Sequence, residues 1–253
     1  MRKYISKNRI LSILSRIVII GLWTFISKII DNEVIFPTIK SIIISLIGIV
    51  KDPKFISIIG YSLIRGLIGF FISLILAIIM GILSSIFRVV FHLMNPIIKF
   101  LSFVPTMAII ILALIWLNNE TVPMFVGFIM VFPILYETVL KSILNVDRNI
   151  MEMAQTYHVD KIIIIKDIYL PSIFNNISQI FVSTLGLNLK MVIAGEVLAQ
   201  PKYGIGSSLQ LQKTYLNTSG VFAWIIIILV MAKLIEYLLN GIKHILDINR
   251  WKG

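Results

Sequence analysis

Long uncharged apolar runs restrict the possible folds of this chain more than any other feature. Residues 66–87 contain no charged side chain over 22 positions, and about 20 such residues are enough for a helix to cross a membrane. Hydrophobic residues make up 58% of the 253-residue sequence, whereas soluble domains contain about half. Together with the need to satisfy every backbone polar group inside a bilayer, these runs predict an all-α protein that crosses the membrane several times.

Six apolar segments, separated by short polar ones, are predicted to span the membrane. They are 11–30, 58–87, 91–117, 121–143, 173–197 and 219–241. The first is the weakest, because Arg16 and Lys28 interrupt it. Its basic start is also typical of a signal peptide, but no small-residue cleavage site follows Ile30, which favours a retained anchor helix.

The distribution of basic residues between the loops predicts the orientation. Thirteen Lys and Arg residues fall on one side of the six spans and five on the other, and the basic side is normally cytoplasmic. Both termini and the segment 146–171 are therefore expected in the cytoplasm, in a multi-pass protein of the cytoplasmic (inner) membrane and its lipid. Topology accounts for the formal net charge of +11, so no nucleic acid is expected as a partner.

The predicted spans divide the chain into three parts. Residues 1–56 hold the N-terminal anchor helix and, at 37–50, a short helix that is expected to lie along the outer membrane interface. Residues 57–245 form the core, which includes the cytoplasmic loop 146–171. Residues 246–253 form a short cytoplasmic tail.

Residues that are missing exclude several kinds of chemistry. The sequence contains no cysteine, which excludes disulfides and thiolate metal sites. The histidines, His92, His158 and His244, lack the spacing of metal ligands. No Gly-x-x-x-x-Gly-Lys-Ser/Thr phosphate loop is present, so the chain itself is not expected to hydrolyse ATP. We therefore expect no metal, no cofactor and no enzyme activity.

A polar segment interrupts the apolar pattern between the fourth and fifth predicted spans. It reads Glu152-Met-Ala-Gln-Thr-Tyr-His158, and nine residues later follows Ile168-Tyr-Leu170-Pro171. We expect two short helices, the first capped by Asp147 or Asn149 and the second by Asp160. His158 is expected at the turn between them, because histidine is one of the residues that tolerate a positive φ.

This segment resembles the cytoplasmic loop of ABC importer permeases, whose pattern is Glu-Ala-Ala, three residues, Gly, nine residues and Ile-x-Leu-Pro. The matching positions are Glu152, Ala154, Ile168, Leu170 and Pro171. Two positions depart from the pattern, where Met153 replaces an alanine and His158 replaces the glycine. The resemblance implies a coupling helix that docks into a groove of a separate ATPase subunit, with Glu152 orienting the loop and Met153 entering the groove.

Shorter pieces extend the resemblance over about residues 55–245. They are Ser62-Leu63-Ile-Arg65, Val104-Pro105, Ile115-Trp116, Phe132-Pro133, Glu196-Val-Leu and Tyr203-Gly-Ile-Gly206. In this order they look like permeases for nitrate, sulfonates, taurine, bicarbonate and thiamine-precursor pyrimidines. The resemblance implies a type I fold of five core helices plus an N-terminal helix. It also implies a homodimer that imports a small anionic or polar solute with two ATPase subunits and an extracytoplasmic substrate-binding protein.

Four residues are candidates for the translocation pathway: Pro105, Pro133, Asn188 and Lys190. The prolines are expected to bend helices at membrane depth, either beside a pathway or as ordinary kinks. Lys190 is an intramembrane charge, and three roles are open to it. It contacts an anionic substrate, pairs with Glu137 or Glu196, or extends to the interface.

Small residues recur at every fourth position of the second span. They are Gly69, Ser73, Ala77, Gly81 and Ser85. Such a stripe lets another helix approach closely, since packing rather than a hydrophobic driving force holds membrane helices together. The partner is either a helix of the same chain or a second copy.

Two rival functions make different demands on the sequence. An ion-gradient-driven transporter is expected to show inverted repeats and acidic residues at membrane depth, and neither is evident. A membrane enzyme or scaffold is expected to show a catalytic cluster or a large soluble part. The polar segment 200–218 is either an outer face that receives a binding protein or a plain loop. Which substrate is carried does not follow from these patterns.

Overall fold

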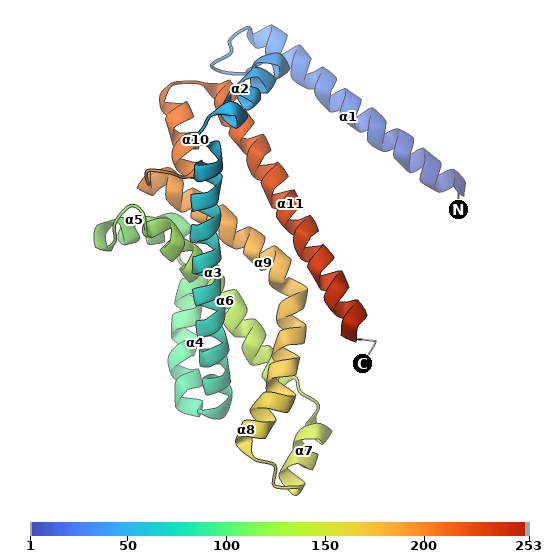
Figure 1. The fold of residues 1–253 in the computed structure, drawn as a ribbon, viewed down its shortest axis with the longest axis vertical. Helices are drawn as coiled ribbons and strands as arrows, with labels where there is room; N and C mark the ends of the chain where they lie inside the picture. The colour runs from blue at the N-terminus through green and yellow to red at the C-terminus, as the bar shows by residue number, and fades with distance from the viewer. Residues whose placement is uncertain (1, 251–253) are drawn as a thin grey trace. The chain divides into compact units, whose positions relative to one another are not determined.

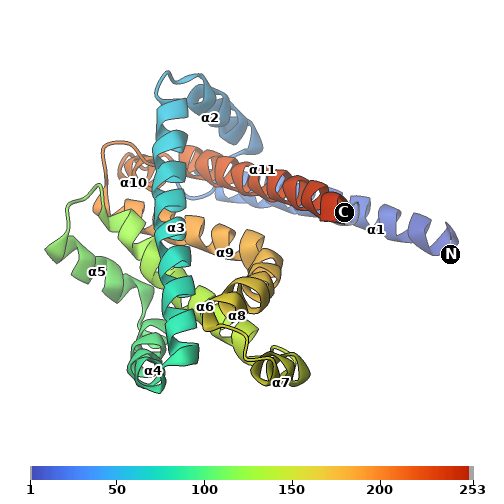
Figure 2. The same cartoon turned by 60° about the horizontal axis from the view of Figure 1, so that its bottom comes forward.

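The structure is a computed structural model that describes residues 2–250. All regular secondary structure in this part of the chain is helical, which confirms the predicted all-α class (Figures 1 and 2). The elements are α1 (Arg2–Ile30), α2 (Ile39–Lys51), α3 (Phe55–Ile86), α4 (Arg88–Phe103), α5 (Thr106–Trp116), α6 (Val122–Leu144), α7 (Arg148–Thr156), α8 (Lys161–Ile164), η1 (Ile165–Tyr169), α9 (Leu170–Ala199), α10 (Ile205–Thr214) and α11 (Thr218–Arg250).

Within residues 2–250, four helices are long and apolar enough to cross a membrane. They are α3, α6, the continuous helix from α8 to α9, and the Thr218–Leu239 part of α11. α4 and α5 make a fifth if they count as one broken span. These helices coincide with the last five predicted spans. The first predicted span lies in α1, and its crossing of the membrane stays a prediction, as does the placement of the tail, whose residues 251–253 lie outside the described residues.

The third predicted span, 91–117, is not one helix. α4 ends at Phe103, α5 begins at Thr106, and the two are bent by 106°. Val104 and Pro105 between them have extended ψ angles of 131° and 129°. A proline disfavours the helical region for the residue before it and cannot donate a backbone hydrogen bond. The kink expected at Pro105 is therefore a complete break.

The second short helix predicted in the polar segment is not separate from the fifth span. Asp160 precedes α8 without a side-chain capping bond, and the helix then runs from Lys161 through the π-helical turn η1 into α9. Pro171 has no N–H with which to continue the α-helical pattern, and the π turn lies directly before it. The fifth span is therefore extended, beginning near residue 161 rather than 173.

The chain forms two compact units. Among the described residues, the smaller unit contains 2–55 with 208–230, and the larger contains 56–207 with 231–250. In the smaller unit Trp23 Nε1 donates to the Pro37 carbonyl at 3.1 Å, and its ring lies 4.4 Å from that of Phe36. The predicted short helix is α2, which Thr38 caps by accepting from the Ser41 N–H at 3.1 Å. Its place at the membrane interface stays a prediction.

α6 is the most buried helix of the larger unit. Val131, Leu135 and Tyr136 of α6 form a core cluster with Phe70 of α3 and Leu185 of α9. α3 and α9 therefore pack on the same central helix. This arrangement fixes the ends of the three helices, where the polar sites described below are found.

The small residues of α3 face α6. A side chain at Gly69 would lie 2.6 Å from the Met124 carbonyl oxygen, and Ser73 Oγ donates to the Phe128 carbonyl at 3.2 Å. A side chain at Gly81 would likewise lie 2.5 Å from Val139 Cγ1. This part of the stripe thus packs within one chain, which is the first of the two alternatives.

The last position of the stripe departs from the pattern. Ser85 is only half-buried, and its hydroxyl donates to the Ile82 carbonyl of its own helix at 2.7 Å. Ser84 is buried instead and accepts from the Tyr136 hydroxyl at 2.9 Å. A strict four-residue step drifts from the contact line of a 3.6-residue helix, so the buried face moves to the neighbouring serine.

Candidate functional site

The first polar segment of interest is α7, a nine-residue helix that begins directly after Asp147. The Asp147 carboxylate accepts from the Asn149 N–H at 2.9 Å, so the first of the two proposed caps is the one that forms. An N-terminal cap of this kind satisfies an otherwise unpaired helical N–H. The sequence therefore defines this short helix locally.

His158 ends this helix with a left-handed backbone. Its φ is +51°, and its N–H donates to the Gln155 carbonyl at 3.1 Å, while its Nδ1 lies 3.0 Å from the same oxygen. The next N–H, of Val159, donates to the Ala154 carbonyl at 2.9 Å. These bonds satisfy the last carbonyls of α7 and turn the chain into α8. Histidine occupies the conformation for which the family pattern uses glycine.

α7 has one buried residue and a broad exposed face. Ala154 is 4% exposed, whereas the apolar side chains of Met153 and Tyr157 are 57% and 78% exposed. Glu152 is also exposed, and its carboxylate lies 2.8 Å from Arg148 Nε on the same helix. The small Ala154 thus lets α7 lie against the chain, and the helix presents Met153 and Tyr157 outward.

The ends of α6 and α9 hold the α7 segment in place. Ser172 Oγ donates to the Ser142 carbonyl at 2.8 Å, and Ile143 and Ile173 share one core cluster. Of the remaining motif residues, Ile168 is half-buried, whereas Leu170 and Pro171 are exposed. α7 and α8 therefore lie at the end of α6 and α9 that is remote from α5 (Figure 1).

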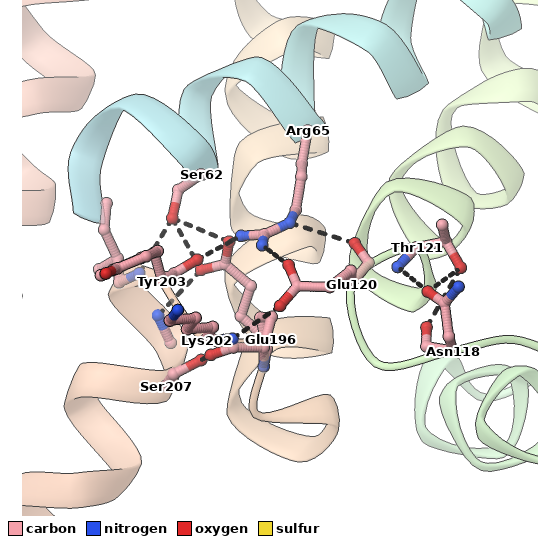
Figure 3. Close-up of polar contacts among 12 residues, drawn as sticks. Ser62, Arg65, Asn118, Glu120, Thr121, Glu196, Lys202, Tyr203 and Ser207 are labelled. Carbon is pink, nitrogen blue, oxygen red and sulfur yellow. Dashed lines mark hydrogen bonds and ion pairs between the residues drawn. The ribbon is translucent and has the colours of Figure 1, made fainter. Parts of the chain in front are cut away.

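A second polar site lies at the opposite ends of the same helices. Arg65 of α3 and Glu196 of α9 are both buried, and Nη1 of the arginine lies 2.9 Å from Oε1 of the glutamate (Figure 3). The Ser62 hydroxyl also contacts the Glu196 carboxylate at 2.8 Å, and the Gly206 N–H donates to its Oε2 at 3.0 Å. Buried charges are tolerated when paired and hydrogen-bonded in this way.

Arg65 connects this pair to two loops. Nη1 donates to the Tyr203 carbonyl at 2.6 Å, Nε donates to the Glu120 carbonyl at 3.2 Å, and Nη2 forms an ion pair with the Glu120 carboxylate. The other oxygen of Glu120 accepts from the Lys202 N–H at 2.8 Å. The planar guanidinium thus joins α3 to the loop before α6 and to the turn after α9 (Figure 3).

The turn at 203–206 fits against Glu196 because it contains glycine. A side chain at Gly206 would collide with the Ile193 carbonyl oxygen and would lie 2.6 Å from Glu196 Cβ. The Ile205 N–H also donates to Ser62 Oγ at 2.9 Å. The fragments Ser62–Arg65, Glu196–Leu198 and Tyr203–Gly206, which the sequence presents as separate pieces, therefore form one site.

The sequence did not reveal that these residues form one site. Two charged residues nevertheless carried a signal that could have indicated it. Arg65 directly precedes the uncharged run 66–87, and Glu196 lies inside an apolar helix. Charged residues in such places usually have a partner in the fold. Glu196 lies in the last turn of α9, and its charge is paired with Arg65.

Two pathway candidates are buried inside the chain. Pro133 is buried within the continuous helix α6. Asn188 has no exposed surface, and its Nδ2 donates to the Gly66 carbonyl at 2.9 Å, while its Oδ1 has no hydrogen-bond partner and faces Gly127. Asn188 of α9 thus packs between α3 and α6, and its place beside a pathway stays a prediction. Pro105 is exposed at the break between α4 and α5.

Lys190 is exposed, only two residues beyond the buried Asn188. The acidic partners considered for it are engaged elsewhere, since Glu196 pairs with Arg65 and Glu137 pairs with Lys141 at 2.9 Å. Among the described residues no ion pair involves Lys190. An ion pair of Lys190 with either acid is therefore excluded. The remaining roles are contact with a substrate in the pathway and extension of the side chain to the membrane interface.

Comparison with known proteins identifies the family. Residues 69–244 match the family described as binding-protein-dependent transport system inner membrane component. The chain is also similar to probable ABC transporter permease proteins of Brucella melitensis biotype 1 and Brucella abortus, at 25% identity over 235 residues, which covers 91% of this chain and 93% or 92% of the relatives. With its apolar helices and type I fold, the chain belongs to the membrane-spanning permeases of binding-protein-dependent ABC transport systems.

Proposed function

We propose that this chain is the permease subunit of an ATP-driven importer for a small anionic or polar solute. Permeases of this family act with ATPase and substrate-binding partners. In the proposed assembly, two copies of this chain enclose the pathway, two ATPase subunits lie on the cytoplasmic side, and a binding protein delivers the solute from outside. Both termini lie in the cytoplasm of a cell whose inner membrane holds the complex.

The observation that carries this proposal is the exposed helix α7 with its fixed turn. Met153 and Tyr157 present apolar surface on a short capped helix, and unpartnered side chains of this kind are typical of a docking surface. Methionine adapts its shape to a groove. Glu152 supports the helix through Arg148 rather than through a distant group. We therefore assign the contact with the ATPase subunit to α7 and the turn at His158.

The long helix from α8 to α9 connects the proposed ATPase contact at α7 with the opposite face of the protein, so that a movement at α7 is transmitted along it. It runs without interruption from Lys161 to Ala199 and carries Glu196 near its far end. The 35 residues between Lys161 and Glu196 correspond to about 50 Å of helix. ATP binding would draw the two copies of α7 together and rock these helices from inward-open to outward-open, and hydrolysis would reverse the change.

The polar site at Arg65 and Glu196 lies at the opposite end of this long helix. It orders the Tyr203–Gly206 turn on the face remote from α7. By the distribution of basic residues this face is extracytoplasmic. We propose that the segment around 200–206 contributes to the surface that receives the binding protein.

The test of coupling compares two tyrosines of similar exposure. Tyr157 follows α7 and is 78% exposed, and Tyr215 follows α10 and is 70% exposed. The tagged chain is co-expressed with its ATPase subunit, and the ATPase that co-purifies is quantified for each alanine variant. We expect Tyr157→Ala to reduce the recovered ATPase at least about tenfold, which matches a loss of about 1.4 kcal/mol or more at a central contact. Tyr215→Ala should recover as much ATPase as the unmodified chain.

Two results would overturn the proposal. One is the absence of any co-purifying ATPase with the unmodified, correctly folded chain. The other is an equal loss for Tyr157→Ala and Tyr215→Ala, which would point to general instability rather than docking. The import direction is tested separately with vesicles, in which a solute must accumulate on the side of the ATPase subunits.

A further inference from the structure

One face of α9 is polar and exposed over four helical turns. Asn175, Gln179, Ser183 and Lys190 are all exposed, and Gly186 lies between them. The successive steps of four, four, three and four residues keep these five positions on one side of the helix. We call this set the polar face of α9.

The opposite side of α9 is the one that packs into the chain. Ile173, Ile177, Thr184, Asn188 and Val192 are buried there. The exposed polar residues and the buried residues therefore lie on opposite sides of α9, although they are interspersed in the sequence. The polar face is therefore the side that the rest of this chain leaves uncovered.

Hydrocarbon is an unfavourable neighbour for this face. α9 belongs to a membrane span, and a polar group without a partner in hydrocarbon costs several kcal/mol, about 2–7 for an amide. Within the part of the chain that the structure describes, no hydrogen bond involves the side chains of Asn175, Gln179 or Lys190. These side chains would be satisfied by water at this face.

The depth of Lys190 makes simple extension to the interface a poor explanation. It lies nine residues before the end of α9 at Ala199, which corresponds to about 14 Å along the helix. The hydrocarbon core of a bilayer is about 30 Å thick, so the residue lies near its middle. A lysine at that depth normally faces a water-filled cavity or a partner.

Lys233 of α11 offers a comparison within the same chain, because it lies among exposed apolar side chains. It is exposed, and the residues around it on α11 are the large apolar side chains of Leu229, Val230, Leu234 and Tyr237, which are 54% to 79% exposed. The equivalent positions around Lys190 are Gly186, Leu187, Met191 and Ala194, which are all half-buried, so no large exposed apolar side chain surrounds this lysine.

We infer that the polar face of α9 lines the translocation pathway and that Lys190 makes this pathway selective for small anions. The ammonium group is a compact charge with three hydrogen-bond donors, which suits a carboxylate, sulfonate or nitrate-like group. Asn175, Gln179 and Ser183 continue the hydrated route toward the α7 end of the helix. Two copies would place two such faces along one pathway, so this inference rests on the proposed transport function.

The absence of cysteine from the sequence permits a direct test. Gly186 lies one turn from Lys190, and a side chain built there meets nothing within 4 Å. Gly186→Cys should therefore fold normally and react with thiol reagents that require water, because the thiolate is the reactive form. The probes are two methanethiosulfonates of similar size, one with a sulfonate and one with a trimethylammonium group. Ile75→Cys, on an exposed apolar part of α3, is the expected unreactive control.

The ratio of the two labelling rates reports the charge at the polar face. We expect the anionic reagent to be favoured, and Lys190→Gln to lower the anionic-to-cationic ratio at least about fivefold, as expected for one unit charge within about 6 Å of the reacting thiol. Lys233→Gln in the same Gly186→Cys background should leave the ratio unchanged.

Three outcomes would overturn the inference: no reaction at Gly186→Cys, a rate no higher than that of Ile75→Cys, or a ratio that Lys190→Gln does not alter. The first two would mean that protein or lipid covers the face. Each leaves the proposed coupling role intact if the ATPase still co-purifies with the chain. In the opposite case, the ATPase subunit does not co-purify, but Gly186→Cys reacts and prefers the anionic reagent. The proposed coupling to ATP hydrolysis would then be wrong, and the water-filled anion pathway would stand.

Discussion

Nη1 of Arg65 lies 2.9 Å from Oε1 of Glu196, and the two residues are 131 positions apart in the sequence. The pair joins the first turns of α3 to the last turns of α9, at the end opposite α7. Because both side chains are buried, the pair is stable only with the hydrogen bonds that surround it. It thus makes these ends of α3 and α9 and the turn at 203–206 one structural unit.

Replacing Glu196 with glutamine is expected to destabilise the chain strongly. Ser62, Arg65 and Gly206 all donate to its two carboxylate oxygens, and an amide would place an N–H₂ donor against one of these donors. Breaking a buried pair in this way costs about 3 kcal/mol. Thermal unfolding in detergent measures the loss. Glu137→Gln is the control, because its exposed pair with Lys141 contributes less than about 1 kcal/mol.

Arg65→Lys should behave as a loss-of-function change although it preserves the charge. The three guanidinium nitrogens serve Glu196, Glu120 and the Tyr203 carbonyl at once, and a lysine ammonium cannot reproduce this planar set of donors. We expect faster hydrogen exchange in residues 200–206, with unchanged exchange in α7. Equal protection of 200–206 in the variant and the unmodified protein would contradict the assigned role of Arg65.

Two glycines of α3 should respond oppositely to alanine. At Gly69 the added methyl group would lie 2.6 Å from the backbone oxygen of Met124, so α3 and α6 must separate; at Gly60 nothing lies within 4 Å. We expect Gly69→Ala to lower the free energy of unfolding by about 1–3 kcal/mol. Gly60→Ala should be neutral or stabilising by up to about 1 kcal/mol through helix propensity. Chemical denaturation of both variants distinguishes the cases, and equal effects would count against close helix packing at Gly69.

The left-handed backbone of His158 predicts an ordered series of substitutions. His158→Gly should retain ATPase stimulation, since glycine adopts a φ of +51° without strain. His158→Val should weaken it several-fold, because a β-branched residue in this region costs about 1–2 kcal/mol or more. The assay is ATP hydrolysis by the assembled complex. A valine variant as active as the glycine variant would show that the turn does not have to keep this conformation.

The local features of the sequence predicted most of the helices, as well as the cap and the turn of α7. The uncharged run 66–87 and the later apolar runs became spans because each has enough apolar length to satisfy its backbone within one helix. Asp147 and His158 were assigned their cap and turn from properties of single residues. These structures depend on neighbours within a few positions, which a sequence displays directly.

Two errors had local causes that the sequence left ambiguous. Pro105 was expected to kink one span, and the structure breaks it, because Val104 also leaves the helical region. The fifth span was expected to begin at residue 173, and the structure extends its helix back to Lys161 through a π turn that precedes Pro171. A proline excludes one hydrogen bond, and the surrounding packing determines whether the helix bends, breaks or adds a residue.

By itself the sequence determined that this protein is all-α and membrane-spanning with a short capped helix, since composition, periodicity and caps are short-range properties. The permease family followed from the resemblance of its motifs. Only the tertiary structure decided which sides of the helices are buried. It placed Asn188 in the core and Lys190 outside, two residues apart, and it joined Arg65 to Glu196. On a helix, residues two apart point in nearly opposite directions, so the packing of α9 against α3 and α6 determines which of the two is exposed.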